Sequence, residues 1–337
     1  ARLHSRRIYL CDAVQKLHST MVTVNVIQPD SPLCTKSETR IFDVAPTQYE
    51  IDDCTYQQFF PVTGVSSSVI KFNISNLGSH YLDLSSTFLH MSACITRDDG
   101  DEAKTEGGSY DEVFPTNAFA NSMFKNVAVY LGQTLVSNNE LYAYRSILVI
   151  LLHSSPTMQQ TVHVAGLFVL DEPNKRNDNI TSHGPASRYA AVKGSKVVDL
   201  MTKLNSDIFC QPKLMLPGVE IRIVFYQNSD VFRLISPSRE KHSHTVEFKS
   251  MTLHVKRVRV TASLFLGHER QLQKSPAVYL LRGVDTKVRS LPQGNLDCHF
   301  ESLYQDRLPS KLCVVLQLTE SFQGALLKNP YNSIITT

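Results

Sequence analysis

The chain has 337 residues, which is enough for one large domain or two medium domains with a sizeable core. Charged residues make up 19% of the sequence and hydrophobic residues 42%, a composition that excludes an intrinsically disordered chain. The net charge of +3 argues against a large nucleic-acid-binding face. The longest apolar run covers residues 147–152, whereas a membrane-spanning helix needs about 20 residues, so we expect a soluble chain without a membrane partner.

Residues 1–60 are expected to form an N-terminal arm and an extended segment, because residues 31–62 are of mixed character and interrupted by proline. The basic start of the chain lacks the sustained apolar core of a secretory signal, and Met21 is a candidate start of translation. The seven cysteines include no C-x-x-C pair, which argues against a zinc ribbon or a redox motif. We therefore expect free thiols in a reducing, intracellular compartment.

The first strands are predicted from alternating apolar residues. Residues 69–75 fit one strand, and residues 81–97 fit a longer one whose alternation shifts phase at residues 85–86, as at a β-bulge. Residues 98–112 are acidic and rich in glycine, so they predict a solvated loop. Further on, two apolar arms joined at residues 131–133 predict a β-hairpin.

Two helices are expected among these strands. A short one is predicted within residues 117–124, and a longer one over residues 139–152, with Asn138 or Asn139 as its cap. Helical spacing predicts one apolar stripe on the longer helix, made by Tyr144, Ile147, Leu148 and Leu151. Residues 171–196 are rich in Asn, Pro, Gly and Ser and predict a loop.

Strand patterns resume in the second half of the chain, at residues 214–216, 219–226, 246–260, 278–281, 286–289 and 312–319. Strands without regular alternation with helices favour an all-β, antiparallel β-sandwich. The charged stretch 236–244 predicts a linker between a first unit, 61–235, and a shorter second unit, 245–337. A half-built sandwich exposes an apolar face and open strand edges, so we expect the second unit to be the less stable one.

No catalytic motif is found by inspection. The sequence has no G-x-S-x-G elbow, no H-E-x-x-H, no P-loop and no G-x-G-x-x-G. His242, His244 and Glu247 approach the metal-binding pattern of cupins, but the spacing differs and the trio lies in the charged linker. Three alternatives remain: a structural protein, a lectin-like β-sandwich that binds a ligand, and a cupin-like metalloenzyme.

Basic residues cluster weakly, in Arg222 and in Lys256-Arg257-x-Arg259. These charges lie within strands, where exposed basic residues more often protect a sheet edge or form surface ion pairs than bind phosphates. Aromatic residues are not interleaved with them, so no base-stacking platform is expected. We predict no specific binding of nucleic acid.

Several different short motifs follow one another along the chain. They contain Pro46 and Thr47; Tyr81, Asp83 and Leu84; Asn117 and Phe124; Tyr144 and Arg145; Asp207 and Phe209; Pro217 and Gly218; Pro309; Asn329 and Pro330. In order and spacing, these motifs resemble the double jelly-roll major capsid proteins of Polinton (Maverick) elements and the related adintoviruses. The likeness covers about residues 31–332, whereas residues 146–152 depart from the acidic continuation that follows this helix start in the family.

The resemblance implies a double jelly roll with an apparently truncated second jelly roll, because members of the family continue beyond the last motif. It implies a structural protein of a virion or a genome-integrated relative, and no catalytic residue, cofactor or metal. It further implies homotrimers that tile an icosahedral lattice, with a penton or minor capsid protein as partner. Outside a virion, we expect the chain in the cytoplasm or nucleus of the host cell.

Overall fold

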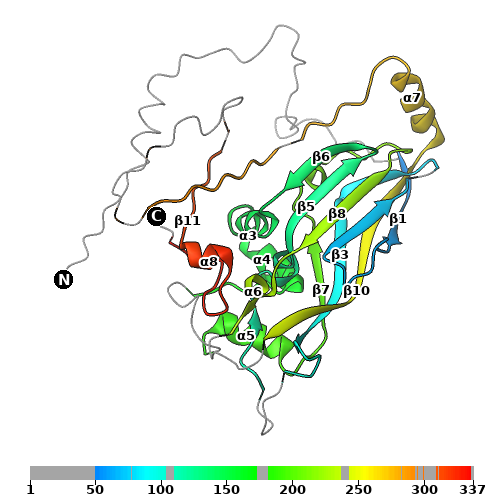
Figure 1. Ribbon diagram of the computed structural model, residues 1–337. Coiled ribbons are helices and arrows are strands. Elements are labelled where there is room, and N and C mark those ends of the chain that lie inside the picture. The colour runs from blue at the N-terminus through cyan, green and yellow to red at the C-terminus, as the bar shows by residue number, and fades with distance from the viewer. Residues whose placement is uncertain are drawn as a thin grey trace. The chain divides into compact units, whose positions relative to one another are not determined.

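The computed structural model describes residues 50–76, 78–103, 110–172, 181–236, 243–281, 283–292 and 311–334, together with Gly294, His299 and Pro309 (Figure 1). Residues 49–333 form one compact unit, to which the description below applies. Most of the predicted N-terminal arm, including Pro46 and Thr47, lies outside the described residues.

Two antiparallel four-stranded sheets form the centre of this unit (Figure 1). The first sheet contains, in spatial order, β1 (Ile51–Phe59), β10 (His244–Val260), β3 (Tyr81–Arg97) and β7 (Val198–Lys203). The second sheet contains β2 (Val69–Ile74), β8 (Ile221–Gln227), β5 (Phe124–Leu131) and β6 (Thr134–Asn139). Two short pairs lie outside them: β4 (Phe114–Pro115) with β9 (Leu234–Ile235), and β11 (Leu316–Gln317) with β12 (Ser333–Ile334).

The order of the eight long strands is that of a jelly roll. Along the chain, β1 lies in the first sheet and β2 in the second, β3 returns to the first, and β5 and β6 form a hairpin in the second. Strands β7, β8 and β10 then alternate between the sheets again. Eight strands wound into two such sheets make two Greek keys. The predicted antiparallel β-sandwich with few helices is therefore confirmed.

Side chains from both sheets fill the space between them. Alternation along β2 buries one face of the strand and exposes the other, as expected for a sheet with one solvated face. The rings of Phe72, Phe124 and Phe225 meet in this core, with centroids 4.8 Å apart for Phe124 and Phe225 and 5.8 Å apart for Phe72 and Phe225. Aromatic pairs at these distances add to the stability that burial supplies.

The longest strands are interrupted where the sequence predicts it. The register between β3 and β10 shifts at two places, between Phe248 and Ser250 and between His254 and Lys256. The second shift faces residues 83–88 of β3, which include the predicted phase change. Each bulge lets the strand keep its apolar side chains in the core on both sides of the interruption.

The predicted boundary between two units is wrong in one respect. Strand β10 was assigned to the second unit, yet it pairs with β3 on one side and with β1 on the other. It is therefore a central strand of the first sandwich, which extends to residue 260 rather than 235. Charged residues before a strand mark a solvated connection, and they carry no information about the sheet that the strand then joins.

Helices cover one end of the sandwich and connect its strands (Figure 1). They are α2 (Phe119–Ser122), α3 (Tyr142–His153), α4 (Pro156–Thr161), η2 (His163–Gly166), α5 (His183–Val192), η3 (Asp207–Cys210) and α6 (Asp230–Arg233). Helices α2 and α3 confirm the two predicted helices. Helix α5 lies in the stretch 171–196, where a loop was predicted.

Two details predicted for α3 are wrong. Its N-cap is Leu141, because Asn139 ends strand β6 and uses its side chain there. The buried face includes Tyr142, Arg145, Ile147 and Ile150, whereas Leu151 of the predicted stripe is exposed. The face of α3 that packs on the sandwich is partly polar, because Arg145 pairs there with the largely buried Asp207.

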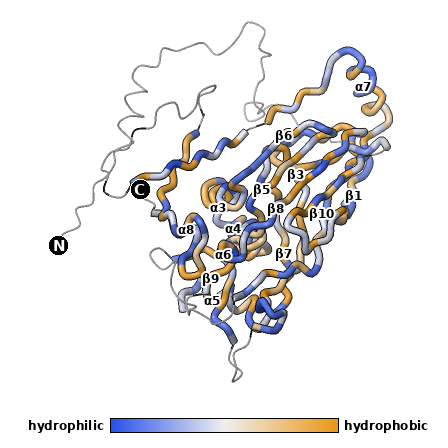
Figure 2. The backbone as a smooth tube through the Cα atoms, viewed as in Figure 1, coloured by the Kyte–Doolittle hydropathy of each residue, from blue (hydrophilic) through white to orange (hydrophobic). Residues whose placement is uncertain are grey.

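After β10 the described chain forms helix α7 (Ala262–Leu272), helix α8 (Thr319–Gln323) and the short pair β11–β12. The predicted strands 278–281 and 286–289 are absent from the described residues, and residues 312–319 contribute only β11. The described residues after β10 build no second sandwich. Figure 2 shows hydrophobic positions along this part of the chain as well as in the strands.

Candidate functional site

One site where residues far apart in the sequence meet lies at the start of α3. Here residues 316–331, which we call the docked segment, lie against the jelly roll. The hydroxyl of Tyr144 is 3.3 Å from the carbonyl oxygens of both Phe322 and Pro330 and can donate to either. It also accepts a hydrogen bond from the side-chain amide of Gln317, at 3.2 Å. Two of the predicted motifs, Tyr144 and Pro330, are therefore in direct contact.

Aromatic rings surround the Tyr144 hydroxyl. The Tyr144 ring stacks on Phe322 at 5.2 Å and meets the edges of Phe232 and Tyr331 at 5.5 and 5.7 Å. Burial raises the pKa of both Tyr144 and Tyr331. Both phenols therefore stay neutral at physiological pH and act as hydrogen-bonding and packing groups, not as bases.

Tyr331 also packs against a hydrophobic cluster in which Ile147 and Ile150 of α3 meet Ala118 and Phe168. The side-chain carbonyl of Asn329 accepts a hydrogen bond from the backbone N–H of Tyr331 at 2.9 Å, and Asn329 is fully buried. A turn fixed by a buried asparagine thus presents Tyr331 to the helix.

The docked segment is also attached through its backbone. The N–H of Ser236 donates to the carbonyl of Leu326 at 2.7 Å. Gly324 has φ +90°, and a Cβ at this position would lie 3.2 Å from the backbone N and Cα of Phe232. Only glycine combines this backbone conformation with such a close approach.

A second cluster joins Arg145, which follows Tyr144 in the same motif, to Asp207. The Arg145 guanidinium lies 2.5 Å from an Asp207 carboxylate oxygen, and both side chains are about nine-tenths buried. Arg145 also donates to the side-chain carbonyl of Asn139, whose amide donates to Ser206 at 3.1 Å. This network fixes α3 to β6 and to η3. Its residues form a buried ion pair, in which the Nε of Arg145 is buried without a hydrogen-bond partner. Breaking such a pair leaves an uncompensated buried charge.

A third cluster is centred on Asn117. Its amide donates to the carbonyl of Val169 at 2.6 Å, and its own side-chain carbonyl accepts from the N–H groups of Ala118 and Val169. The same amide lies 3.2 Å from Asp171, which is paired with the fully buried Arg188 at 2.8 Å. Asn117 therefore holds the chain that returns from η2 against the start of α2.

The remaining predicted residues have separate structural positions. Asp83 accepts hydrogen bonds from the hydroxyls of Ser85 and Ser86, at 2.7 and 2.8 Å, and pairs with Lys256 at 3.4 Å. Burial opposes ionisation of Asp83, but these hydrogen bonds and the lysine charge outweigh it, and its pKa is lowered. The hydroxyl of Tyr81 lies 2.8 Å from His268 Nδ1, which links β3 to α7.

Core packing and a turn account for most of the others. Leu84, Phe124 and Phe209 are buried in the hydrophobic core. Pro217 and Gly218 form a turn in which Gly218 has φ +80° and donates its N–H to the Asn76 carbonyl at 2.8 Å. Pro309 is exposed. Among the motif residues that the structure describes, Tyr144 comes together with the Asn329-Pro330 pair, and Arg145 comes together with Asp207. The others serve the fold at scattered places.

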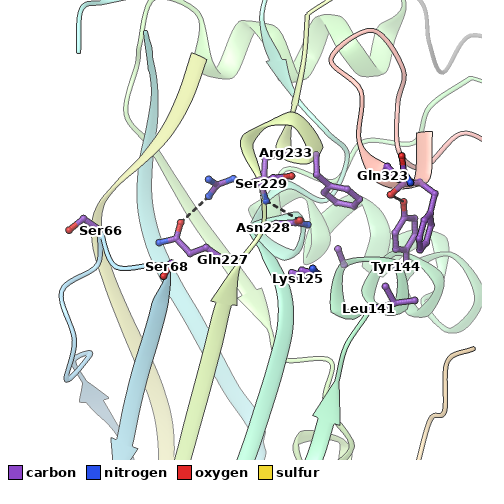
Figure 3. Close-up of a pocket in the computed structure, with 13 residues that line it drawn as sticks. Ser66, Ser68, Lys125, Leu141, Tyr144, Gln227, Asn228, Ser229, Arg233 and Gln323 are labelled. Carbon is purple, nitrogen blue, oxygen red and sulfur yellow. Dashed lines mark hydrogen bonds between the residues drawn. The ribbon is translucent and has the colours of Figure 1, made fainter. Parts of the chain in front are cut away.

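A cleft of about 740 Å³ lies beside the docked segment (Figure 3). Its polar wall comes from the strand ends, and its aromatic wall from Tyr144, Phe232 and Phe322. The other lining residues are Ser66, Ser68, Lys125, Leu141, Ala143, Gln227, Asn228, Ser229, Arg233 and Gln323. None of these lining residues is His, Asp, Glu or Cys.

Arg233 is the most buried charge on this wall. It donates to Gln227 at 3.2 Å and pairs with Asp230 at 2.6 Å, while burial lowers its pKa. Asp230 in turn accepts from the backbone N–H of Val246, at 3.0 Å. The guanidinium is therefore committed to holding α6 between β8 and β10.

The cupin-like alternative does not fit the geometry. His244 is buried, and its Nε2 lies 2.9 Å from Asp111, which also binds Arg97 through two hydrogen bonds of 2.9 Å. Glu247 is exposed and pairs with Lys249 at 2.8 Å. Residues 244 and 247 point to opposite faces of β10, since they are an odd number of residues apart. His242 lies outside the described residues.

Within the described ranges, no three His, Cys, Asp or Glu side chains are arranged to hold a metal ion. Asp111 belongs to the acidic loop that was predicted to be solvated, and its burial beside His244 and Arg97 corrects that prediction for this residue. No helix of the described chain is both long and apolar enough to cross a membrane. The four described cysteines, Cys54, Cys94, Cys210 and Cys313, are free thiols.

The basic residues of the predicted cluster face neighbouring side chains. Lys256 pairs with Asp83, Arg257 donates to Gln57 at 2.8 Å, and Arg259 lies 3.9 Å from Asp52. Arg222 stacks over the Tyr130 ring, 4.5 Å from its centroid. These contacts fit the expected surface pairing of basic residues on strands.

Sequence reasoning missed several residues of these clusters. Arg188 and Asp171 lie in the predicted loop, and their residue types gave no signal there. Gln317, Phe322 and Phe232 were not selected because each acts through a partner distant in the sequence. The Asn329-Pro330 motif was the available signal for the docked segment, but it did not identify Tyr144 as its partner.

No protein-family model matches the chain. It is similar to the uncharacterized protein F54H12.2 of Caenorhabditis elegans, at 21% identity over 269 residues that cover 78% of this chain and 62% of that protein. Among solved structures, it is similar to a chain of the Sputnik virophage (14% identity, TM-score 0.45), covering 69% of this chain and 53% of that one. It is also similar to the mavirus major capsid protein (12%, TM-score 0.39), covering 72% of this chain and 54% of that one. The chain thus spans less than two thirds of these proteins.

Proposed function

We propose that the chain is a structural shell protein of the jelly-roll capsid type. The observation that carries this proposal is the strand order β1-β10-β3-β7 facing β2-β8-β5-β6, with an interior filled by side chains. A packed jelly roll of this kind offers outer surfaces for assembly. The motif resemblance to Polinton and adintovirus capsid proteins points to the same function, in a virion or in a genome-integrated relative.

The proposed partner is the chain itself. Trimers would form the capsomers of an icosahedral lattice, with a penton or minor capsid protein at the vertices, and the protein would be located in the virion or otherwise inside the host cell. Function would then depend on interfaces, with closed symmetry limiting the size of each assembly unit. We further propose that a second jelly roll in the full protein begins after α7, rather than at residue 245.

The proposal is tested by assembly of the purified chain. Size-exclusion chromatography with light scattering should give trimers as the concentration rises from micromolar to near-millimolar, and electron microscopy should show particles of near-hexagonal outline. Low and high salt are compared, because surface charge pairs are screened by salt. A monomer throughout both series would overturn the proposal for this chain.

Phe225→Ala supplies a control that should fail to assemble because it damages the core. Leu280→Ala supplies a matched control in the exposed region, since Leu280 is 79% exposed. If Leu280→Ala assembles as the unaltered chain does and Phe225→Ala does not, assembly requires the folded jelly roll. Equal assembly of both variants would indicate aggregation and would contradict the proposal.

A further inference from the structure

Strand β7 lies at one edge of the first sheet and presents a row of exposed side chains on the outer face (Figure 1). Leu200 and Thr202 are buried, whereas Asp199, Met201 and Lys203 alternate with them and are exposed. The side chain of Asp199 is 73% exposed, and Met201 is 41% exposed. Three successive outward positions of this strand are therefore an acid, an apolar residue and a base.

The two charges at the ends of this row are open to a partner. The Asp199 carboxylate accepts a hydrogen bond from the Ser92 hydroxyl at 2.5 Å and lies 4.0 Å from Nε2 of His90, and it stays exposed beside both. At the other end of the row, Lys203 is the neighbour of Phe88 in the register of β3 and β7. Exposed charges of opposite sign thus lie on each side of Met201.

Aromatic and imidazole rings continue this outer face from β3 across the sheet. The ring of Phe88 stacks on His254 of β10 with centroids 4.7 Å apart, and it meets the ring of Tyr56 of β1 at 5.4 Å. Tyr56 is 54% exposed. Partly exposed rings and an exposed methionine gain stability when a partner removes them from water. The apolar part of the face favours a partner, and the charges specify which one.

The order of the charges along β7 fits a second copy of the same strand. A two-fold axis through Met201 sets two β7 strands antiparallel, with each Met201 against the partner's Met201. Asp199 then lies opposite the partner's Lys203, and Lys203 lies opposite the partner's Asp199, because both positions are two residues from the axis. A parallel arrangement would place like charges together. Opposite charges across an interface fix its register, and a two-fold contact uses the same patch on both copies.

We propose that the outer face of β7 forms a two-fold contact between copies of this chain, centred on Met201. The contact is face to face, because η2 lies against the edge of β7. A Cβ on Gly166 would be 3.4 Å from the Met201 carbonyl oxygen. The inference rests on the proposed shell function and deepens it. Three-fold contacts alone close into trimers, whereas an added two-fold contact joins such trimers into a lattice.

Charge reversal tests the contact by complementation. Asp199→Lys gives each copy two bases in the row, and Lys203→Asp gives each copy two acids, so either variant alone brings like charges together twice. In a mixture of the two variants, every base meets an acid. With one variant immobilised and the other in solution, biolayer interferometry should show that the mixed pair binds roughly tenfold more tightly than either variant binds itself. The chain that carries both changes should recover the self-association of the unaltered chain.

Glu220→Lys and Lys71→Asp form the control pair, because both side chains are exposed and lie outside β7. These changes alter the net charge as the test changes do, so general attraction between the two variants is the same. A preference for the mixed pair that occurs in the test pair alone, and that weakens as salt screens the charges, supports the contact. Equal behaviour of the two pairs, or no recovery in the chain that carries both changes, overturns it.

Two features keep this result separate from folding and from shell formation. A variant that does not fold cannot be rescued by mixing, so tight binding in the mixture shows that both variants fold. Three-fold contacts are common to all combinations and cancel in the comparison. Light scattering and electron microscopy score trimers and shells independently. Trimers without the mixed-pair preference would reject this inference alone, and the preference without trimers or shells would reject the proposed function alone.

Discussion

Strand β10 and residues 278–281 both have a sequence pattern that predicts a strand, but only β10 forms one. Val246 and Phe248 alternate with polar residues and lie buried in the sandwich, whereas Val278 and Leu280 flank Tyr279 and are exposed. Both stretches fit strands by composition and spacing. The difference is that β10 has β3 and β1 on its two sides, while the described residues 278–281 have no strand beside them.

The comparison shows what an alternating sequence can specify. It determines which side chains share a face, but burial of that face requires a second sheet, and pairing requires neighbouring strands. The jelly roll supplies both to β10. The docked segment represents a third case, because it contributes only β11 and the short helix α8 and is held by specific aromatic and hydrogen-bonding contacts that bury Asn329 and Pro330.

The largest effect should come from truncating the core of the jelly roll. Phe225→Ala removes a fully buried ring that contacts Phe72 and Phe124, and we expect it to lower the free energy of unfolding toward the upper end of about 3 to 5 kcal/mol. Leu280→Ala, at an exposed side chain, should change it by less than about 0.5 kcal/mol. Urea denaturation measures both values, and similar losses would contradict the contrast between the two regions.

The buried ion pair should give the next largest effect. Asp207→Asn leaves the Arg145 guanidinium buried without its carboxylate, and we expect a loss of roughly 3 kcal/mol in the free energy of unfolding. Glu247→Gln, which breaks the exposed pair with Lys249, should cost less than about 1 kcal/mol. Arg145→Met combined with Asp207→Leu should recover much of the loss. A small effect of Asp207→Asn would show that water reaches the pair.

Gly324→Ala should act on the docked segment alone. The added Cβ meets the backbone of Phe232 in a left-handed conformation, so we expect a cost of about 1 to 3 kcal/mol to docking. Hydrogen exchange should become faster in residues 316–331 and stay unchanged in β8. Gly283→Ala is the matched control, because no atom lies within 4 Å of its Cβ position. Global unfolding of Gly324→Ala would mean that the segment and the jelly roll unfold together.

The smallest effect is expected from pH, on the outer face of the first sheet. Burial and the nearby His90 lower the pKa of His254 below its ordinary value. His254 therefore binds a proton more readily in the unfolded chain than in the folded one. The free energy of unfolding should be highest above about pH 6.5, the ordinary pKa of histidine, and should decline as the pH falls below that value. His254→Gln should reduce this decline in thermal melts between pH 7 and 5, and Gln58→Asn on neighbouring β1 should not. An unchanged slope in His254→Gln would assign the decline to other groups.

Local sequence patterns determined the individual elements of the sandwich. Alternation specified β2, β3, β8 and β10, the turn at residues 131–133 specified the β5–β6 hairpin, and helical spacing specified α3. These features depend on neighbours within a few residues, so they can be predicted from local sequence. Strands β1 and β7 were not predicted, because their alternation is weak and their positions depend on β10 and β3.

Tertiary contacts decided the rest. Whether β10 completes the first sandwich and what binds Tyr144 depend on residues more than a hundred positions away, in β3 and in the docked segment. Which face of α3 is buried depends on Asp207, 62 positions from Arg145. A local pattern contains no information about such a partner, because the free energy of the contact arises only when the fold brings the two segments together. The sequence by itself therefore determined the strands of an antiparallel β-sandwich, and the tertiary structure decided their jelly-roll order, where the sandwich ends and what is attached to it.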